Sequence, residues 1–180
     1  MEETTNAISD LVIRRARAAD AAELAEFAAR TFTDTFGPDN RPEDMAMFLA
    51  STFRTEHQRR EITDPAYATL LAEVDGALAG YAQLRLSTPP DCVTGPSPIE
   101  LLRFYVDTPW KGRGIAQQLM AEVRRTAKKL GAQTLWLGVW ERNPRAQAFY
   151  LKSGYRDVGA HDFVLGMDRQ TDRIMVVSLI

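Results

Sequence analysis

The feature that most constrains this chain is a glycine-rich turn between an apolar strand and an amphipathic helix. Residues 110–116 read Trp-Lys-Gly-Arg-Gly-Ile-Ala. The apolar run from Ile99 to Val106 predicts a strand, and the apolar positions that recur at steps of three and four after Gly112 predict a helix that ends at Gly131. Glycine lets the backbone approach a ligand, and the first amides of a helix are unpaired donors at the positive end of its dipole. The segment therefore predicts a pyrophosphate site.

The glycine spacing excludes two familiar phosphate loops. Gln117 stands where a dinucleotide fingerprint needs glycine, and the chain has no Gly-Lys-Ser/Thr ending of a P-loop. Neither NAD nor ATP is favoured as the ligand. Taken by itself, the segment is also compatible with a turn that only joins two elements.

The composition is that of one globular domain. With 180 residues, 45% of them hydrophobic and 26% charged, the chain can bury a core without disulfides or metal. We predict a single domain over residues 11–180 after a flexible tail at residues 1–10. The net charge of -2 argues against nucleic acid as the main partner, and the lone Cys92 with two histidines argues against a metal site.

The amino-terminal stretch is polar and acidic, without the basic start and apolar run of a secretory signal. The chain also lacks a run of about 18 apolar residues, the length a membrane helix needs. We therefore expect a cytoplasmic protein with no membrane partner. The sequence leaves both a monomer and a homodimer open.

The other periodicities predict a mixed sheet flanked by helices, in the α/β (α+β) class. Asp20 with Glu23 is expected to cap the first helix, and Asn40 the second. Asp75 and Gly76 predict a tight hairpin turn. Strands are expected at residues 11–15, 67–74, 78–86, 99–106, 134–139, 155–165 and 174–179, and later helices from Pro42, at 56–62, from Gly112 and at 144–152.

A second informative segment, residues 143–150, reads Asn-Pro-Arg-Ala-Gln-Ala-Phe-Tyr and is followed by Gly154 and Tyr155. Asn143 is a typical helix cap. Phe149 and Tyr150 suit a hydrophobic core as well as a functional site.

Together the two segments resemble the motifs of the GNAT acetyltransferases. Residues 111–116 are similar to the Gln/Arg-x-x-Gly-x-Gly/Ala motif, matched by Gly114 and Ala116. Lys111 replaces the usual Gln or Arg. A lysine keeps the positive charge of arginine but lacks its planar guanidinium, which can donate two parallel hydrogen bonds. Residues 143–150 resemble the Asn-x-x-Ala-x-x-Phe-Tyr signature. The resemblance is firm over residues 99–158 and looser elsewhere, where residues 31–45 and 165–172 look like the PaiA-type spermidine/spermine branch.

This resemblance implies the GNAT fold, a single mixed and mostly antiparallel sheet split by a cleft for acetyl-CoA, with no metal. It implies main-chain contacts with pantetheine at Phe104, Tyr105 and Val106, and a further contact at Asn143. The pyrophosphate contacts that it implies are Lys111, Gly112, Arg113, Gly114, Ile115, Ala116 and Gln117. Arg113 is equally compatible with a solvated loop.

The resemblance also implies direct attack of an amine on the thioester. Tyr150 is expected to give a proton to the departing sulfur, and Glu100 to take one from the amine, directly or through water. Strand alternation predicts that Glu100, Leu102, Phe104 and Val106 share one face. It places Arg103 on the other face, paired with an acid. An edge charge in solvent is the alternative for Glu100.

The acceptor is expected to be a small primary amine. Asp34, Asp39, Glu43 and Asp44 lie between the first two helices and are suited to attract a cation such as a polyamine, although acids near a helix start also follow from the dipole. The candidate acceptor residues are Asp34, Phe36, Glu100 and Arg103. Acetylation of protein amino termini or antibiotic amines stays open, as does a CoA-binding sensor without catalysis.

Overall fold

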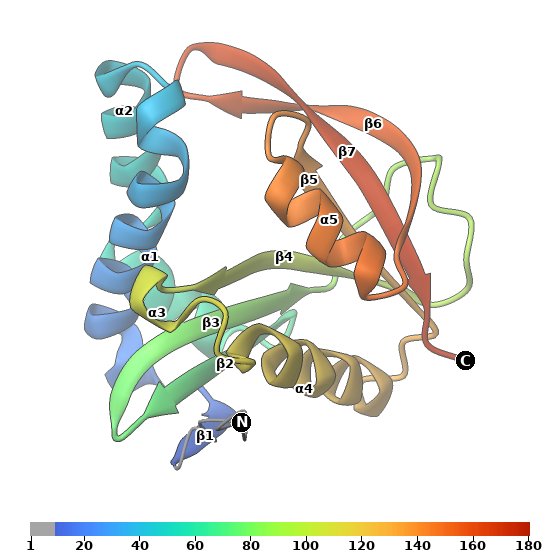
Figure 1. Cartoon of the computed structure of the whole chain (residues 1–180), viewed down its shortest axis with the longest axis horizontal. Helices are drawn as coiled ribbons and strands as arrows, with labels where there is room; N and C mark the ends of the chain where they lie inside the picture. The colour runs from blue at the N-terminus through green and yellow to red at the C-terminus, as the bar shows by residue number, and fades with distance from the viewer. Residues whose placement is uncertain (1–9) are drawn as a thin grey trace, which may run out of the picture.

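The computed structural model describes residues 10–180, and their strands form one seven-stranded sheet in the order β1-β2-β3-β4-β5-β7-β6 (Figure 1). The predicted tail lies outside the described residues except for Asp10. The strands are β1 (Leu11–Arg15), β2 (Tyr67–Val74), β3 (Ala77–Arg85), β4 (Pro98–Val106), β5 (Thr134–Trp140), β6 (Arg156–Leu165) and β7 (Asp168–Ser178). The helices are α1 (Ala21–Phe36), α2 (Pro42–Thr52), α3 (Thr55–Thr63), α4 (Ile115–Lys129) and α5 (Pro144–Lys152).

All neighbouring strands pair antiparallel except β4 and β5, which are parallel. The predicted mixed, mostly antiparallel sheet is therefore confirmed. The turn between β2 and β3 has positive φ at Asp75 and Gly76, as the hairpin prediction requires.

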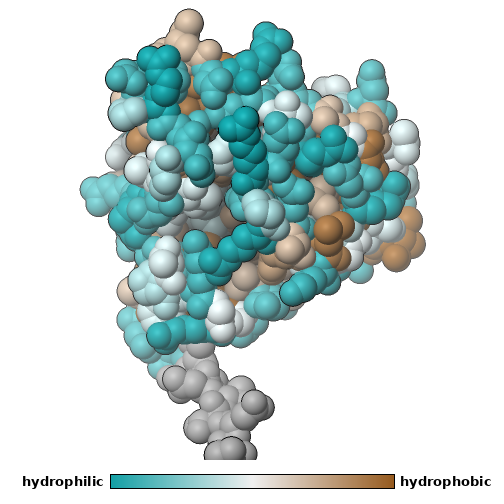
Figure 2. Space-filling model, turned by 45° about the horizontal axis from the view of Figure 1, so that its top comes forward, coloured by the Kyte–Doolittle hydropathy of each residue, from teal (hydrophilic) through white to brown (hydrophobic). Residues whose placement is uncertain are grey.

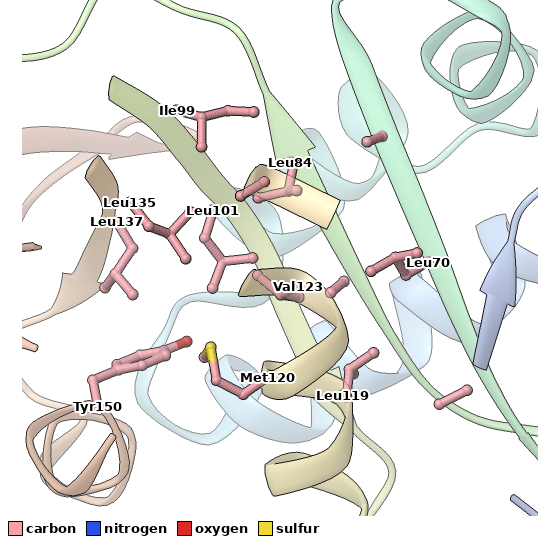
Figure 3. Close-up of a cluster of buried hydrophobic side chains, with 14 of the residues drawn as sticks. Leu70, Leu84, Ile99, Leu101, Leu119, Met120, Val123, Leu135, Leu137 and Tyr150 are labelled. Carbon is pink, nitrogen blue, oxygen red and sulfur yellow. The ribbon is translucent and has the colours of Figure 1, made fainter. Parts of the chain in front are cut away.

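Helices cover both faces of the sheet. On one face α4 and α5 pack on a core that includes Leu101, Leu137 and Val123 (Figure 3). On the other face α1 and α2 pack through residues such as Phe32 and Met45. The inner positions predicted for α4 are buried, apart from Leu130, which follows the last helical residue and is 50% exposed.

Two capping predictions are wrong. The side chain of Asp20 makes no cap bond to α1, because its carboxylate accepts hydrogen bonds from Arg14 and from the backbone N–H of Arg17. Asn40 does not cap α2, whose N-cap is Arg41. Its side-chain amide instead donates to the carbonyl of Phe36, 2.7 Å away, at the end of α1.

A β-bulge in β4 changes which residues share a face. Gln83 of β3 pairs with Arg103 and the next residue, Leu84, pairs with Leu101, which leaves Leu102 as an extra residue. A bulge inverts the side-chain alternation beyond it. Ile99 and Leu101 therefore pack on the α4 face, and so do Phe104 and Val106. The prediction that Glu100 shares a face with Phe104 and Val106 is wrong.

The β6–β7 hairpin reaches across to α2 (Figure 1). At its tip the N–H of Met167 donates to the buried carboxylate of Asp44 at 2.7 Å. A Cβ on Gly166 would lie 2.5 Å from the Cα of Asp44, so only glycine allows this approach. Strand β7 begins at Asp168, six residues before the predicted start at Ile174.

The outer surface in Figure 2 is mostly hydrophilic, with hydrophobic residues in smaller groups. Among residues 10–180, no helix is long and apolar enough to cross a membrane.

Candidate active site

A cavity of about 600 Å³ lies where β4 and β5 part. The two strands pair only from Pro98 to Glu100 on β4, and the bulge at Leu102 follows directly. Because a bulge bends its strand, β4 turns away from β5 beyond this point. The cavity is lined from both helical layers and has the size of a small-molecule site.

The edge of β4 that faces β5 has no strand partner from Leu101 onward. Five residues of this stretch line the cavity, and they include Phe104, Tyr105 and Val106. Backbone groups on an open strand edge can pair with an extended ligand that carries amides.

The amino terminus of α4 opens into the same cavity. Gly112 and Gly114 have φ of 78° and 83°, a conformation that disfavours other residues, and Gly114 is the N-cap. A Cβ on either glycine would have no atom within 4 Å, and no side chain caps the helix. The first amides of α4 are therefore unpaired, and the space before them is open. This arrangement is suited to bind a pyrophosphate.

The remaining residues of the predicted pyrophosphate loop divide into two groups. Lys111, Ala116 and Gln117 line the cavity. The side chains of Arg113 and Ile115 do not: the guanidinium of Arg113 lies 5.2 Å from the centroid of the Trp110 ring, and Ile115 is fully buried in the core.

Helix α5 supplies the second motif. Asn143 caps it by accepting a hydrogen bond from the N–H of Ala146 at 3.1 Å, and it also lines the cavity. Tyr150 lines the cavity too, and its hydroxyl points from α5 towards α4 and Met120 (Figure 3). Burial raises the pKa of Tyr150 above its ordinary value, so the hydroxyl keeps its proton at neutral pH.

Three of the four predicted acceptor residues lie outside the cavity lining. Glu100 is buried, and its carboxylate binds Arg85 and the hydroxyl of Ser87. Arg103 forms the expected ion pair with an acid, which is Glu61.

Asp34 is half exposed and lies 3.8 Å from Arg30. Phe36, at the end of α1, is the predicted acceptor residue that does line the cavity. The predicted acidic cluster is also divided, since Asp44 instead holds the hairpin tip.

Sequence reasoning missed a carboxylate in the cavity wall, Asp172 of β7. The residue is 9% exposed, and its Oδ2 lies 3.9 Å from Nε2 of His161 on β6. Burial raises the pKa of Asp172 from its ordinary 3.8 to about 6, because the site disfavours the charged form, with Glu141 acting in the same direction and His161 opposing it. The sequence carries no strand signal here, because residues 168–173 are all polar and show no alternation of apolar and polar residues.

Comparison with known proteins places these features in one family. Residues 23–155 match the acetyltransferase (GNAT) family. The chain belongs to this family. It is also 38% identical over 161 residues to an uncharacterized N-acetyltransferase of Lactobacillus delbrueckii subsp. lactis, and the alignment covers 88% of this chain and 93% of that protein.

Solved structures show the same GNAT fold. One is the PaiA N-acetyltransferase of Thermoplasma acidophilum in complex with coenzyme A, with a TM-score of 0.77, 22% identity, and coverage of 94% of this chain and 99% of that one. Another is yncA of Salmonella typhimurium with its cofactor acetyl-CoA, with a TM-score of 0.67, 22% identity, and coverage of 96% of this chain and 95% of that one. The predicted fold is thus confirmed, and the chain is an acetyltransferase of the GNAT type.

Proposed function

We propose that this acetyltransferase moves the acetyl group of acetyl-CoA directly to a primary amine, with both substrates bound at once. The observation that carries the proposal is a single cavity that joins an uncapped helix amino terminus to a space on the opposite face of the sheet. The family match and the CoA complexes of the two GNAT structures support the choice of donor.

The residues of the chain fit the parts of acetyl-CoA. The first amides of α4 are donors for the pyrophosphate, and Lys111 adds a cation beside them. The open edge of β4 from Phe104 to Val106 can accept and donate hydrogen bonds along the pantetheine amides. Asn143 lines the same path.

Tyr150 is the proposed acid. Its hydroxyl is neutral at the pH of the reaction because burial raises its pKa, and it lies on the cavity wall near the split. It can therefore give its proton to the CoA sulfur as the carbon–sulfur bond breaks. Positioning of the two substrates is expected to supply much of the remaining rate.

The acceptor end of the cavity is mainly aromatic. Phe36, Tyr105, Trp140 and Phe163 line it together with Asp172. Aromatic faces attract organic cations, so a cationic amine such as a polyamine suits this end. Free amino groups of antibiotics or peptides have the same reacting nitrogen, and only an assay with each kind of amine distinguishes these acceptors.

The test is a panel of spermidine, lysine, kanamycin and a short peptide, each incubated with acetyl-CoA while CoA thiol is measured. The proposal predicts amine-dependent CoA release and an acetylated amine by mass spectrometry. Reactions without amine control for hydrolysis. CoA binding with no release for any amine would instead favour a sensor.

A further inference from the structure

The acceptor side of the cavity contains one buried carboxylate that the family motifs do not assign. Asp172 lines the cavity, whereas Glu100, the base expected from the sequence, does not. The carboxylate of Glu100 is held by Arg85 at 2.7 Å and by Ser87 at 2.7 Å. The Glu100 carboxylate is thus engaged by neighbouring side chains and lies outside the cavity lining.

The position of Asp172 follows from strand pairing. It lies opposite Trp140 of β5 and opposite His161 of β6, so it occupies the middle strand of three. Its side chain projects on the face where Trp140 packs against Phe36 of α1, with ring centroids 5.7 Å apart. This is the side of the sheet opposite to α4 and α5.

Glycine at position 138 makes room for the carboxylate. A Cβ there would lie 3.1 Å from Oδ2 of Asp172 and 3.1 Å from Nε2 of His161. These distances are tighter than ordinary van der Waals contact. Gly138 itself lines the cavity, so the missing side chain leaves Asp172 accessible to a ligand.

Among the described residues no hydrogen bond to the Asp172 carboxylate satisfies ordinary distance limits, and the nearest basic side chain is that of His161, with its Nε2 3.9 Å from Oδ2. The charged and titratable groups that act on it are His161 from β6, Glu141 after β5 and Tyr105 from β4. The aromatic neighbours cannot neutralise it. The Asp172 carboxylate is therefore a hydrogen-bond and proton acceptor without a donor among residues 10–180, and it is largely buried in the wall of the cavity.

We propose that Asp172 is the catalytic base that takes the proton from the acceptor ammonium group. This inference rests on the proposed function and deepens it. The Asp172 carboxylate takes one N–H proton from the bound ammonium, and the nitrogen lone pair forms a bond to the thioester carbon. The carbon–sulfur bond breaks, and the sulfur takes the Tyr150 proton.

The remaining protons balance. The nitrogen loses its second proton, which restores the Tyr150 hydroxyl. Asp172 releases its own proton to solvent on the side of His161, whose side chain is 36% exposed. One ammonium and one thioester thus give one amide, one thiol and one proton.

The experiment compares Asp172→Asn with the wild type from pH 5 to 10, using the best amine from the panel at saturating acetyl-CoA. A primary ammonium has a pKa of about 10.4, so the free amine rises about tenfold for each pH unit below that value. The variant depends on free amine and should follow this rise. The wild-type rate should level off above a pH of about 6, where Asp172 is ionised.

The ratio of the wild-type rate to the Asp172→Asn rate is therefore expected to be about 1000-fold at pH 7 and to approach one near pH 10. Asp172→Glu should keep the level profile at a lower rate, because it retains a carboxylate. Asp162→Asn is the matched control: this neighbour of His161 is exposed, pairs with Arg169 and should leave the profile unchanged.

CoA binding, followed by calorimetry, shows that each variant is folded and should be unchanged. A constant ratio across the pH range would overturn the inference, since it indicates positioning only. So would a pH-dependent ratio in Glu100→Gln with none in Asp172→Asn. If the wild type acetylates no amine, the proposed function fails instead.

Discussion

The two ends of the cavity are built in different ways. The α4–α5 end comes from two short continuous segments, residues 104–117 and 143–150, whose backbone and caps form the ligand surface. The opposite end comes from single residues on α1, β4, β5, β6 and β7. A surface made of local backbone leaves a motif in the sequence, whereas one assembled by strand pairing over long distances does not.

The two ends also differ in charge. At the α4–α5 end, free helix amides and Lys111 favour an anion. At the other end, aromatic rings and the carboxylate of Asp172 favour a cation. One cavity thus presents opposite preferences on the two sides of the sheet, and the split between β4 and β5 is where two bound groups can meet.

The largest expected effect is on CoA binding at the amino terminus of α4, and a control variant distinguishes it from the effect of backbone strain. Gly114→Val should weaken CoA binding about 100-fold, because a side chain displaces charge-assisted hydrogen bonds worth about 1.5–3 kcal/mol each. Gly131→Val is the matched control, since Gly131 has a φ of 85° at the other end of α4. Both variants should lose stability. Equal CoA affinity in the two, measured by calorimetry on folded protein, would remove the loop from the site.

The next effect tests whether Tyr150 acts in the chemical step and not in CoA binding. Tyr150→Phe should keep CoA affinity and lower the acetyl-transfer rate about 100-fold, because only the acid is lost. Tyr155→Phe is the control: Tyr155 is buried in the same aromatic group, but its hydroxyl donates to the sulfur of Met120. Stopped-flow rates within twofold of wild type for both variants would count against an acid role.

The smallest effect concerns stability at the acceptor end. The raised pKa of Asp172 means that ionisation destabilises the fold, so the wild type loses stability as pH rises from about 4 to about 6. Asp172→Asn stays neutral. Its free energy of unfolding should exceed that of the wild type above pH 6, and by less at pH 4.

Asp157→Asn, on the same β6–β7 hairpin, should change stability in the opposite direction from Asp172→Asn. Hydrogen bonds from Arg173 lower the pKa of Asp157, so its stabilising contribution is present at neutral pH and is lost as pH falls below its ordinary pKa. Urea unfolding at pH 3, pH 4 and pH 7 measures the pH dependence of stability for both variants. A deficit for Asp172→Asn at pH 7 would show that the carboxylate is not destabilising.

The sequence predicts the frame of the fold well because most elements carry clear local signals. The step of three and four in α4, the Asp75–Gly76 turn and Pro144 at the start of α5 are all determined by nearby residues. The helix caps are less predictable, although Asp20 and Asn40 have the right chemistry. Arg14 of β1 donates to the carboxylate of Asp20. The Asn40 side chain donates to the carbonyl of Phe36 and accepts from the amide of Gln170 on β7.

The site is predictable only where the backbone makes it. The bulge at Leu102 follows from pairing with β3, and without it Glu100 is assigned to the wrong face. Asp172 lies in the polar half of β7, which is held by pairing with β5 and β6 rather than by apolar burial. A pattern of apolar residues alone therefore starts the strand too late, at Ile174, and omits this carboxylate.

The most direct test is a crystal structure of the protein with acetyl-CoA. The account predicts the pyrophosphate within hydrogen-bonding distance of amides from residues 112–117, pantetheine along Phe104 to Val106, and the thioester at the split, with Tyr150 on one side and Asp172 facing it from the other. A pyrophosphate bound away from α4, or a thioester that does not reach the space beside Asp172, would contradict the account.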